Sequence, residues 1–316
     1  MPHNCGCRTN GLCYRYPVEA NNTKGHWAGT APLLCLGILA VSTGALFVRL
    51  ADCPPLTKAA WRTGLAALIL MPLALRAKPT AQQSIFPWKL CLLAGVLLAL
   101  HFATWITSLD SLSVASSVLL VNTMPLFVVL LSPRISGEAR SPRLLAGVAI
   151  GFAGAALLPL SEGLAASPEG ASTTLGAGLA LLGAVSWAGY ALVGKRLTHR
   201  LPLFRYLAVT YGAASITLVL LALANGDSLI PPNRSTLLAL VSLALVPQLI
   251  GHSLLNRAIR QLPTGVVALT VLLEPIFAIL LAALFLKEFP PTSAYWAAPL
   301  ILGGIAISIR RSDPLP

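Results

Sequence analysis

The residues of this sequence that could do chemistry are few, and they lie inside long apolar runs. Glu274 is the only acidic residue near the middle of such a run. Placing a carboxylate at this depth in a membrane costs roughly 2.5 to 3.5 kcal/mol, so such a residue usually faces a cavity or a polar partner. A substrate amine, a proton or a neighbouring cation could be that partner. The alternative is a structural hydrogen bond beside Pro275.

Gln248, His252 and Asn256 follow one another at four-residue spacing. On a helix these three side chains share one face. A polar stripe of this kind would be unstable against lipid, so we expect it to face the interior of a helical bundle. It either lines a substrate path or forms hydrogen bonds between helices, which are worth about 0.6 kcal/mol each.

Two histidines and several aromatic residues add to this set. His101 and Trp105 are four residues apart on another apolar run. Two intramembrane histidines could relay protons near neutral pH, although one membrane histidine is as often a hydrogen-bond donor to a neighbouring helix. Trp187, Tyr190 and Tyr211 offer flat faces that could stack on a ring or on a cationic amine, or they contribute to ordinary packing.

Arg62 lies about two turns into its apolar run. Its guanidinium offers two parallel donors and could recognise a carboxylate or a phosphate. The alternative is that the long side chain extends to the outer membrane interface and has no contact with a substrate.

Motifs of enzymes and cofactor sites are missing from the sequence. There is no His-Glu-x-x-His motif, no paired Asp motif, no Ser or Cys nucleophile with a base and no Gly-rich phosphate loop. The spacing of Cys5, Cys7 and Cys13 fits no standard zinc site. We therefore expect no enzyme activity, no cofactor and no metal.

The composition defines the elements that must hold these residues. Hydrophobic residues make up 56% of the 316 residues, charged residues make up 10%, and the mean hydropathy is +0.79. These values are typical of an integral membrane protein. The apolar runs do not alternate with polar residues as the strands of a barrel do, so we predict an all-α membrane protein. About ten runs are long enough to cross the bilayer, near 31–50, 56–75, 88–108, 112–132, 143–160, 174–193, 204–224, 236–255, 264–286 and 292–309.

The chain repeats itself after 150 positions. The two matching frames are Leu119-x-Val121-x-x-x-Pro125-x-Phe127 and Leu269-x-Val271-x-x-x-Pro275-x-Phe277. Glu138 and Glu288 fall in register, as do Gly154 and Gly304. We predict that the two prolines mark kinks or helix ends at equivalent places in the two copies. The glycines of the fifth and tenth runs predict close helix packing.

This duplication predicts the domain organisation. Five spans per copy is an odd number, so the second copy enters the membrane from the opposite side and the repeats are inverted. The expected segments are a polar tail at 1–30, a first repeat at 31–160, a linker at 161–173, a second repeat at 174–310 and a short tail at 311–316.

The net charge of +12 follows from the expected topology. All but five of the 22 Lys and Arg residues fall on one side of the membrane, and the five are Arg49, Lys58, Arg62, Arg234 and Lys287. The positive-inside rule therefore places both termini in the cytoplasm. The charge requires no nucleic acid or acidic partner.

The sequence resembles the EamA-type family of the drug/metabolite transporter superfamily. The resemblance rests on the ten spans in two halves, on Leu273-Glu274-Pro275-Ile276-Phe277-Ala278, on Lys287-Glu288, on Ser186-Trp187-Ala188 and on Trp61-Arg62. Two places depart from the pattern. Met124 stands where the second half has Glu274, and Ser132-Pro133-Arg134 replaces the apolar end of the fourth span, so we expect that helix to end early.

The resemblance implies a bacterial inner-membrane carrier of small polar metabolites, often an exporter of amino acids or related compounds, with a cavity between its two halves. Its partners would be the lipid bilayer and a small-molecule substrate, and its oligomeric state is left open. We expect alternating access of a cavity near Glu274, with a small amphipathic or zwitterionic substrate moving outward. The alternatives are an uncoupled, channel-like facilitator and a membrane sensor that does not transport.

Overall fold

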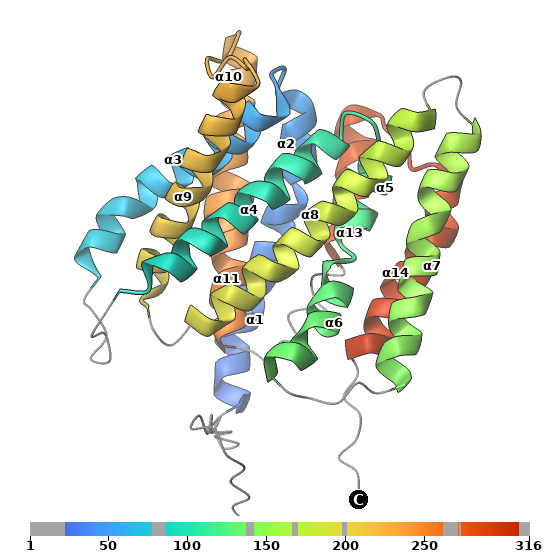
Figure 1. The fold of residues 1–316 in the computed structure, drawn as a ribbon, viewed down its shortest axis with the longest axis horizontal. Helices are drawn as coiled ribbons and strands as arrows, with labels where there is room; N and C mark the ends of the chain where they lie inside the picture. The colour runs from blue at the N-terminus through green and yellow to red at the C-terminus, as the bar shows by residue number, and fades with distance from the viewer. Residues whose placement is uncertain are drawn as a thin grey trace, which may run out of the picture.

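The computed structural model describes residues 23–77, 86–136, 142–165, 170–197, 201–261, 271 and 273–309. Every regular element in these ranges is a helix (Figure 1). The expectation of an all-helical protein is therefore confirmed. Each backbone N–H and C=O inside a helix has its partner within the same segment, as the interior of a bilayer requires.

Six helical segments in the described ranges are long and apolar enough to cross a membrane. They are Pro32–Leu50, Pro55–Arg76, Trp88–Ser108, Thr173–Leu197, Leu203–Ala224 and Arg234–Ile259. Four shorter apolar segments occupy the positions of the other expected spans, and they are Val114–Val128, Leu145–Leu157, Leu273–Leu286 and Thr292–Ile307. The number of ten spans stays a prediction, because these four are shorter than a full crossing.

Six of the expected spans consist of one continuous helix each. They are α3 (Pro55–Arg76), α4 (Trp88–Ser108), α7 (Pro142–Ala165), α8 (Gly170–Leu197), α9 (Leu203–Ala224) and α14 (Thr292–Ile309). These helices form most of the frame in Figure 1, where α3, α4 and α9 lie on one side and α7 and α14 on the other.

The other four spans change their helical geometry part-way along. The first consists of α1 (Thr23–Ser42) and α2 (Gly44–Leu50), and the fourth of α5 (Val114–Val121) and α6 (Met124–Ser136). The eighth consists of α10 (Arg234–Leu243), the π-helix η1 (Ala244–His252) and α11 (Ser253–Gln261), and the ninth of α13 (Leu273–Leu281) and the π-helix η2 (Ala282–Leu286). Interrupted helices and π-helical turns often occur at functional sites.

The two repeat-related prolines lie at helix beginnings. Pro125 is in the first turn of α6, directly after the break at Asn122 and Thr123, and Pro275 is in the first turn of α13. The first turn of a helix tolerates proline because its N–H groups have no partner within the helix. The fourth span is thus broken at this point, and the helix end beside Pro125 is one of the two forms expected there, a kink or a helix end. The expected early end is wrong, since α6 continues to Ser136.

Glycines bring α7 and α14 into close contact. A Cβ atom at Gly304 would lie 2.5 Å from the carbonyl oxygen of Gly147, and one at Gly154 would lie 2.7 Å from the Cβ of Leu300. Only a residue without a side chain fits such distances, as expected for helix packing in lipid. The close packing predicted for these two spans is confirmed.

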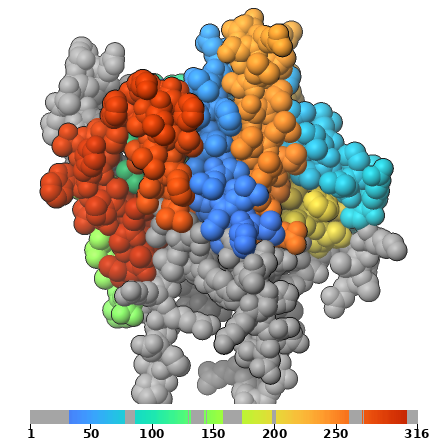
Figure 2. Space-filling model, turned by 180° about the vertical axis from the view of Figure 1, so that it is seen from behind, coloured from blue at the N-terminus to red at the C-terminus, as the bar shows by residue number. Residues whose placement is uncertain are grey.

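The helices pair across the two halves in a regular way. α3 packs against α9, and α7 packs against α14. α4 of the first half packs against α8 of the second, and α1 of the first half packs against η1 and α11 of the second. Figure 2 shows α1 and α2 in blue between α10 to α11 in orange and the ninth span in red. Exchanging the two halves converts each of these pairs into another observed pair, which is the pairing expected for a two-fold relation.

Candidate functional site

A small cavity lies where the two halves meet. It is lined by Val41, Arg62, His101, Phe102, Trp105, Val121, Asn122, Met124, Trp187, His252, Leu255 and Glu274. Its volume is about 30 Å³, which accommodates a water-sized group. Ligand sites for small molecules usually measure roughly 300 to 1,000 Å³. The cavity is therefore too small for a metabolite in this conformation.

Arg62 lies inside the protein beside this cavity. The residue is 1% exposed, and its Nε donates a hydrogen bond of 2.6 Å to Oε1 of Gln248. Its Cζ lies 3.9 Å from the ring centre of Phe102 and 5.7 Å from that of Trp105. Nη1 has no hydrogen-bond partner among the described residues. The alternative in which Arg62 extends to the membrane interface is therefore wrong, and the cation is held by a neutral amide and two aromatic faces.

Glu274 reaches the same cavity from the second half. It lies in the first turn of α13, where the helix dipole favours a negative group. Its backbone oxygen accepts a hydrogen bond of 3.3 Å from the hydroxyl of Ser42, and its carboxyl group lies within reach of the Asn122 side chain. No ion pair joins Glu274 to Arg62 in the described structure. Two opposite charges thus share one cavity without direct contact.

The two histidines line the cavity from different halves. Nδ1 of His101 donates a hydrogen bond of 2.9 Å to the carbonyl oxygen of Gly183, because a carbonyl can only accept. In the neutral ring, Nε2 is then the acceptor. His252 contacts the ring of Phe102 edge-on, with centroids 5.5 Å apart, and Phe102 also contacts His101 at 4.8 Å. The two imidazoles form no hydrogen bond with each other in the described ranges, and proton relay stays a prediction.

Both tryptophans of the candidate set line the cavity. Trp105 lies nearly parallel to the ring of His101, with centroids 6.2 Å apart and an interplanar angle of 7°. Trp187 lines the cavity from α8, which also carries Gly183. A side chain at Gly183 would lie 3.3 Å from the Cβ of Trp105, so the glycine permits the close approach of α8 to α4.

Four of the candidate residues form a layer behind the cavity wall. Gln248 is fully buried and holds Arg62. Tyr190 donates a hydrogen bond of 3.1 Å to Oδ1 of Asn256, whose Nδ2 donates in turn to the backbone oxygen of His252 at 2.7 Å. Tyr211 is fully buried beside Gln248. These residues position the groups that line the cavity.

Several lining residues were not predicted from the sequence, and Asn122 is the most informative of them. It is 1% exposed and follows the last residue of α5. Its Nδ2 donates a hydrogen bond of 3.0 Å to the carbonyl oxygen of Val118, while Oδ1 has no hydrogen-bond partner among the described residues. The signal was present in the sequence, because Asn122 is a polar residue in the middle of an apolar run and lies within the repeated motif, three residues before Pro125.

The comparisons with known proteins agree with this architecture. The model of the EamA-like transporter family matches residues 29–159 and again residues 174–310. A two-fold helical bundle with interrupted helices and a charged cavity between its halves is the architecture of many membrane transporters. The chain belongs to the EamA-like transporter family.

Individual relatives are similar at low identity. An uncharacterized transporter of Archaeoglobus fulgidus is 28% identical over 92% of this chain and 99% of its own length. The uncharacterized inner membrane transporter YedA of Escherichia coli K12 is 30% identical over 72% of each chain. A riboflavin transporter of Rhizobium johnstonii is 30% identical, and the match spans about half of each protein, 52% in both.

A probable terminal-alkyne amino-acid exporter of Streptantibioticus cattleyicolor is 27% identical over 61% of this chain and 63% of its own length. One solved structure, described only as a crystal structure of a protein, superposes with a TM-score of 0.65. It is 23% identical and covers 89% of this chain and 96% of its own. A likeness at this identity shows the fold alone.

Proposed function

We propose that the protein is an inner-membrane secondary carrier that exports a small zwitterionic metabolite by alternating access between two inverted repeats. The observation that carries this proposal is the pair of separated charges at one buried cavity, Arg62 from the first half and Glu274 from the second. A molecule with a carboxylate and an ammonium group would neutralise both. Its carboxylate would face Arg62, and its ammonium group would face Glu274.

The unpartnered polar atoms around the cavity support a polar ligand. Nη1 of Arg62 and Nε1 of Trp105 are donors without a partner among the described residues, and Oδ1 of Asn122 is an acceptor without one. A buried polar atom left unpaired costs about 1 to 3 kcal/mol. A bound substrate or water would remove this cost, and the atoms supply donors beside Arg62 and an acceptor near Glu274.

Alternating access explains how so small a cavity could serve a metabolite. The cavity holds only a water-sized group, so the substrate must enter after the halves move apart on one side of the membrane. Repeats of inverted topology give the two sides nearly equivalent helices, so that rocking of one half against the other exposes the cavity alternately.

The names of the relatives support transport of a small polar molecule, and the name of one of them specifies an amino acid, which is a zwitterion. One relative is named as a probable amino-acid exporter, another as a riboflavin transporter, and a third as an inner membrane transporter. All three names describe transport of a small polar molecule or location in the inner membrane. The distribution of Lys and Arg supports an orientation with both termini in the cytoplasm.

Counterflow in proteoliposomes tests the proposal. Vesicles containing the purified protein are loaded with one unlabelled amino acid or related metabolite, and uptake of the same labelled compound is followed without any ion gradient. We expect transient accumulation of a zwitterion. Its amide or ester, which lacks the carboxylate, and its N-acetyl derivative, which lacks the ammonium group, should each exchange at least about tenfold more slowly, because a hydrogen bond to a charged group is worth roughly 1.5 to 3 kcal/mol.

Each other outcome has a definite meaning. Uptake that equilibrates without transient accumulation would indicate a channel-like facilitator. Equal exchange of the zwitterion and its two derivatives would contradict the assignment of Arg62 and Glu274 to the substrate. Absence of exchange for the whole panel, with protein shown to be folded, would contradict carriage of this class of compound and would favour the sensor.

A further inference from the structure

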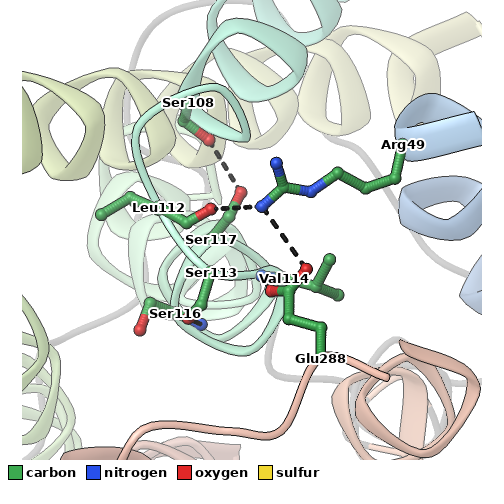
Figure 3. A network of polar contacts seen from close by, with 8 residues as sticks. All are labelled: Arg49, Ser108, Leu112, Ser113, Val114, Ser116, Ser117 and Glu288. Atoms are coloured by element: carbon green, nitrogen blue, oxygen red, sulfur yellow. Dashed lines mark hydrogen bonds and ion pairs between the residues drawn. The ribbon is translucent and has the colours of Figure 1, made fainter. Parts of the chain in front are cut away.

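A second polar cluster lies away from the cavity, where three segments from both halves meet (Figure 3). Arg49 lies in the last turn of α2, Leu112 lies in the connection from α4 to α5, Val114 begins α5, and Glu288 follows the ninth span. Nη2 of Arg49 donates a hydrogen bond of 2.8 Å to the carbonyl oxygen of Leu112 and lies 3.5 Å from Oε2 of Glu288. Among the described residues, Arg49 and Glu288 form the one ion pair between side chains.

Glu288 also caps a helix of the other half. Its Oε1 accepts a hydrogen bond from the backbone N–H of Val114, the first residue of α5. The hydroxyl of Ser113 accepts from the N–H of Ser116 at the same helix end. The beginning of α5 therefore has one cap from its own repeat and one from the other repeat. A negative group is stabilised there by the helix dipole and by N–H groups that lack a helical partner.

The backbone at Lys287 holds Glu288 in this position. Lys287 has a φ of 57°, a left-handed conformation that is uncommon for a residue with a side chain. The following N–H, of Glu288, donates a hydrogen bond of 3.2 Å to the carbonyl oxygen of Ala282. This turn ends the ninth span and directs the side chain of Glu288 toward α5. Figure 3 shows its carboxylate beside Val114.

Short rigid segments connect this cluster to the cavity. α5 has eight residues, all of them buried, so it is about 12 Å long at 1.5 Å per residue. Its first residue contacts Glu288, and Asn122 directly after its last residue lines the cavity. On the other half, the ninth span carries Glu274 at the cavity and ends just before Glu288. A contact between Ser108 and Ser117, 2.7 Å between hydroxyl oxygens, further ties α5 to α4.

We propose that Arg49 and Glu288 form the outer gate of the carrier. This inference rests on the proposed function, because a gate has a role only if the two halves of the protein separate. The charge pattern assigns Arg49 and Lys287 to the outer side of the membrane, so the cluster closes that side. The first and fourth spans of one half are joined to the ninth span of the other by the contacts of Glu288 with Arg49 and with Val114. Both contacts must open before the cavity can face outward. The two side chains are 32% and 27% exposed, so water can replace their contacts when they separate.

Accessibility of the cavity from outside tests the gate without any substrate. The reporter is a Val41→Cys substitution in a full-length protein whose six natural cysteines are replaced by serine, because Val41 lines the cavity and is 5% exposed. A membrane-impermeant thiol reagent is added to the outside of intact cells, and the labelling rate is measured. Arg49→Ala and Glu288→Ala should each raise this rate about 5- to 30-fold, the change expected from the loss of the ion pair and, for Glu288, of the helix cap as well.

Arg234→Gln is the matched control. Arg234 is also assigned to the outer side and is exposed, but it lies outside this cluster, so its loss should leave the labelling rate unchanged. The double reversal of Arg49→Glu with Glu288→Arg should lower the labelling rate relative to either single reversal. Equal labelling in all these proteins, each shown to be folded, would overturn the proposal.

A cross-link separates the gate from general destabilisation. Arg49→Cys and Glu288→Cys are combined with the Val41→Cys reporter and joined by a short, reducible bifunctional thiol reagent before labelling. Labelling of the reporter thiol is measured as the difference between this protein and the same protein with Val41 unchanged, because the thiols at positions 49 and 288 react with the reagent once the cross-link is reduced. The cross-link should abolish this difference, and a reductant should restore it. Undiminished labelling in the cross-linked protein would overturn the gate. If gating changes appear while the wild-type protein shows no counterflow, the gate holds and the proposed substrate class fails.

Discussion

Arg62 and Glu274 bring opposite charges to one cavity without forming an ion pair. Burying two charges is costly, and attraction between them offsets the cost only with good geometry and further hydrogen bonds. Arg62 receives part of this compensation from Gln248 and the face of Phe102. Glu274 receives part from its place at the start of α13. Each charge is thus stabilised by neighbouring groups other than the opposite charge and remains free to contact a substrate.

Replacement of Glu274 tests this arrangement at the level of one residue. Glu274→Gln keeps the size of the side chain and removes its charge, so we expect a folded protein with counterflow reduced by about 10- to 100-fold, the value of a charged hydrogen bond. The measurement is counterflow at several pH values, alongside Asp227→Asn as a control that removes an acid from the connection after α9. Normal exchange by the Glu274 variant at every pH would assign the acid a structural role.

At the scale of the helices, the interrupted spans and the glycine-rich spans have different roles. The first, fourth, eighth and ninth spans change geometry, and all four contribute residues to the cavity or its supporting layer. The continuous pair of α7 and α14 is instead held in direct backbone contact at Gly147, Gly151 and Gly304. Helices that must approach to this distance cannot carry side chains at the crossing point.

Two neighbouring glycines of α14 provide a matched test of this packing. A Cβ at Gly304 would lie 2.5 Å from the backbone nitrogen of Gly151, whereas one at Gly303 would have nothing within 4 Å. Overpacking costs about 1 to 3 kcal/mol. Gly304→Ala should therefore lower the midpoint of thermal unfolding in detergent by several degrees, and Gly303→Ala should leave it unchanged. Equal effects of the two substitutions would contradict the crossing point.

At the scale of the whole molecule, the two halves are joined along matching contacts. Equivalent spans of the two halves pair with each other in the contacts of α3 with α9 and of α7 with α14. Exchanging the two halves converts the contact of α4 with α8 into that of α1 with η1 and α11. The cavity lies within this arrangement, with residues from both halves in its wall. Motion of one half against the other would therefore alter the cavity and the cluster of Arg49 and Glu288 together.

The orientation of the whole chain gives a further prediction. The positive-inside rule places the C-terminus in the cytoplasm and the exposed connection after α9 outside. In a protein without natural cysteines, Asn225→Cys should react with an impermeant thiol reagent on intact cells, and Ser312→Cys should react only after the cells are opened. The reverse pattern would show that the chain has the opposite orientation, and the outer gate would then lie on the cytoplasmic side.

Half of the residues that line the cavity could be predicted from the types and positions of polar and aromatic residues in apolar runs. Arg62, His101, Trp105, Trp187, His252 and Glu274 all line it. Burial explains this success, because a polar side chain in a membrane helix must face the interior of the bundle. The same logic holds for Asn122, a polar residue inside an apolar run, but it does not extend to Phe102 or Met124, which look like ordinary packing residues in the sequence.

The sequence by itself determined the all-helical class, the duplication and the family, because hydropathy, spacing and repeated motifs are local properties of the chain. Only the tertiary structure decided that Arg62 is buried against Gln248, that the fourth span breaks before Pro125, and that Glu288 caps α5 of the other half. These contacts join residues 186 and 174 positions apart in the chain, and in the sequence Arg62 was equally compatible with the membrane interface. The partner of a buried polar group depends on how the helices pack, and no local sequence pattern encodes contacts between residues so far apart in the chain.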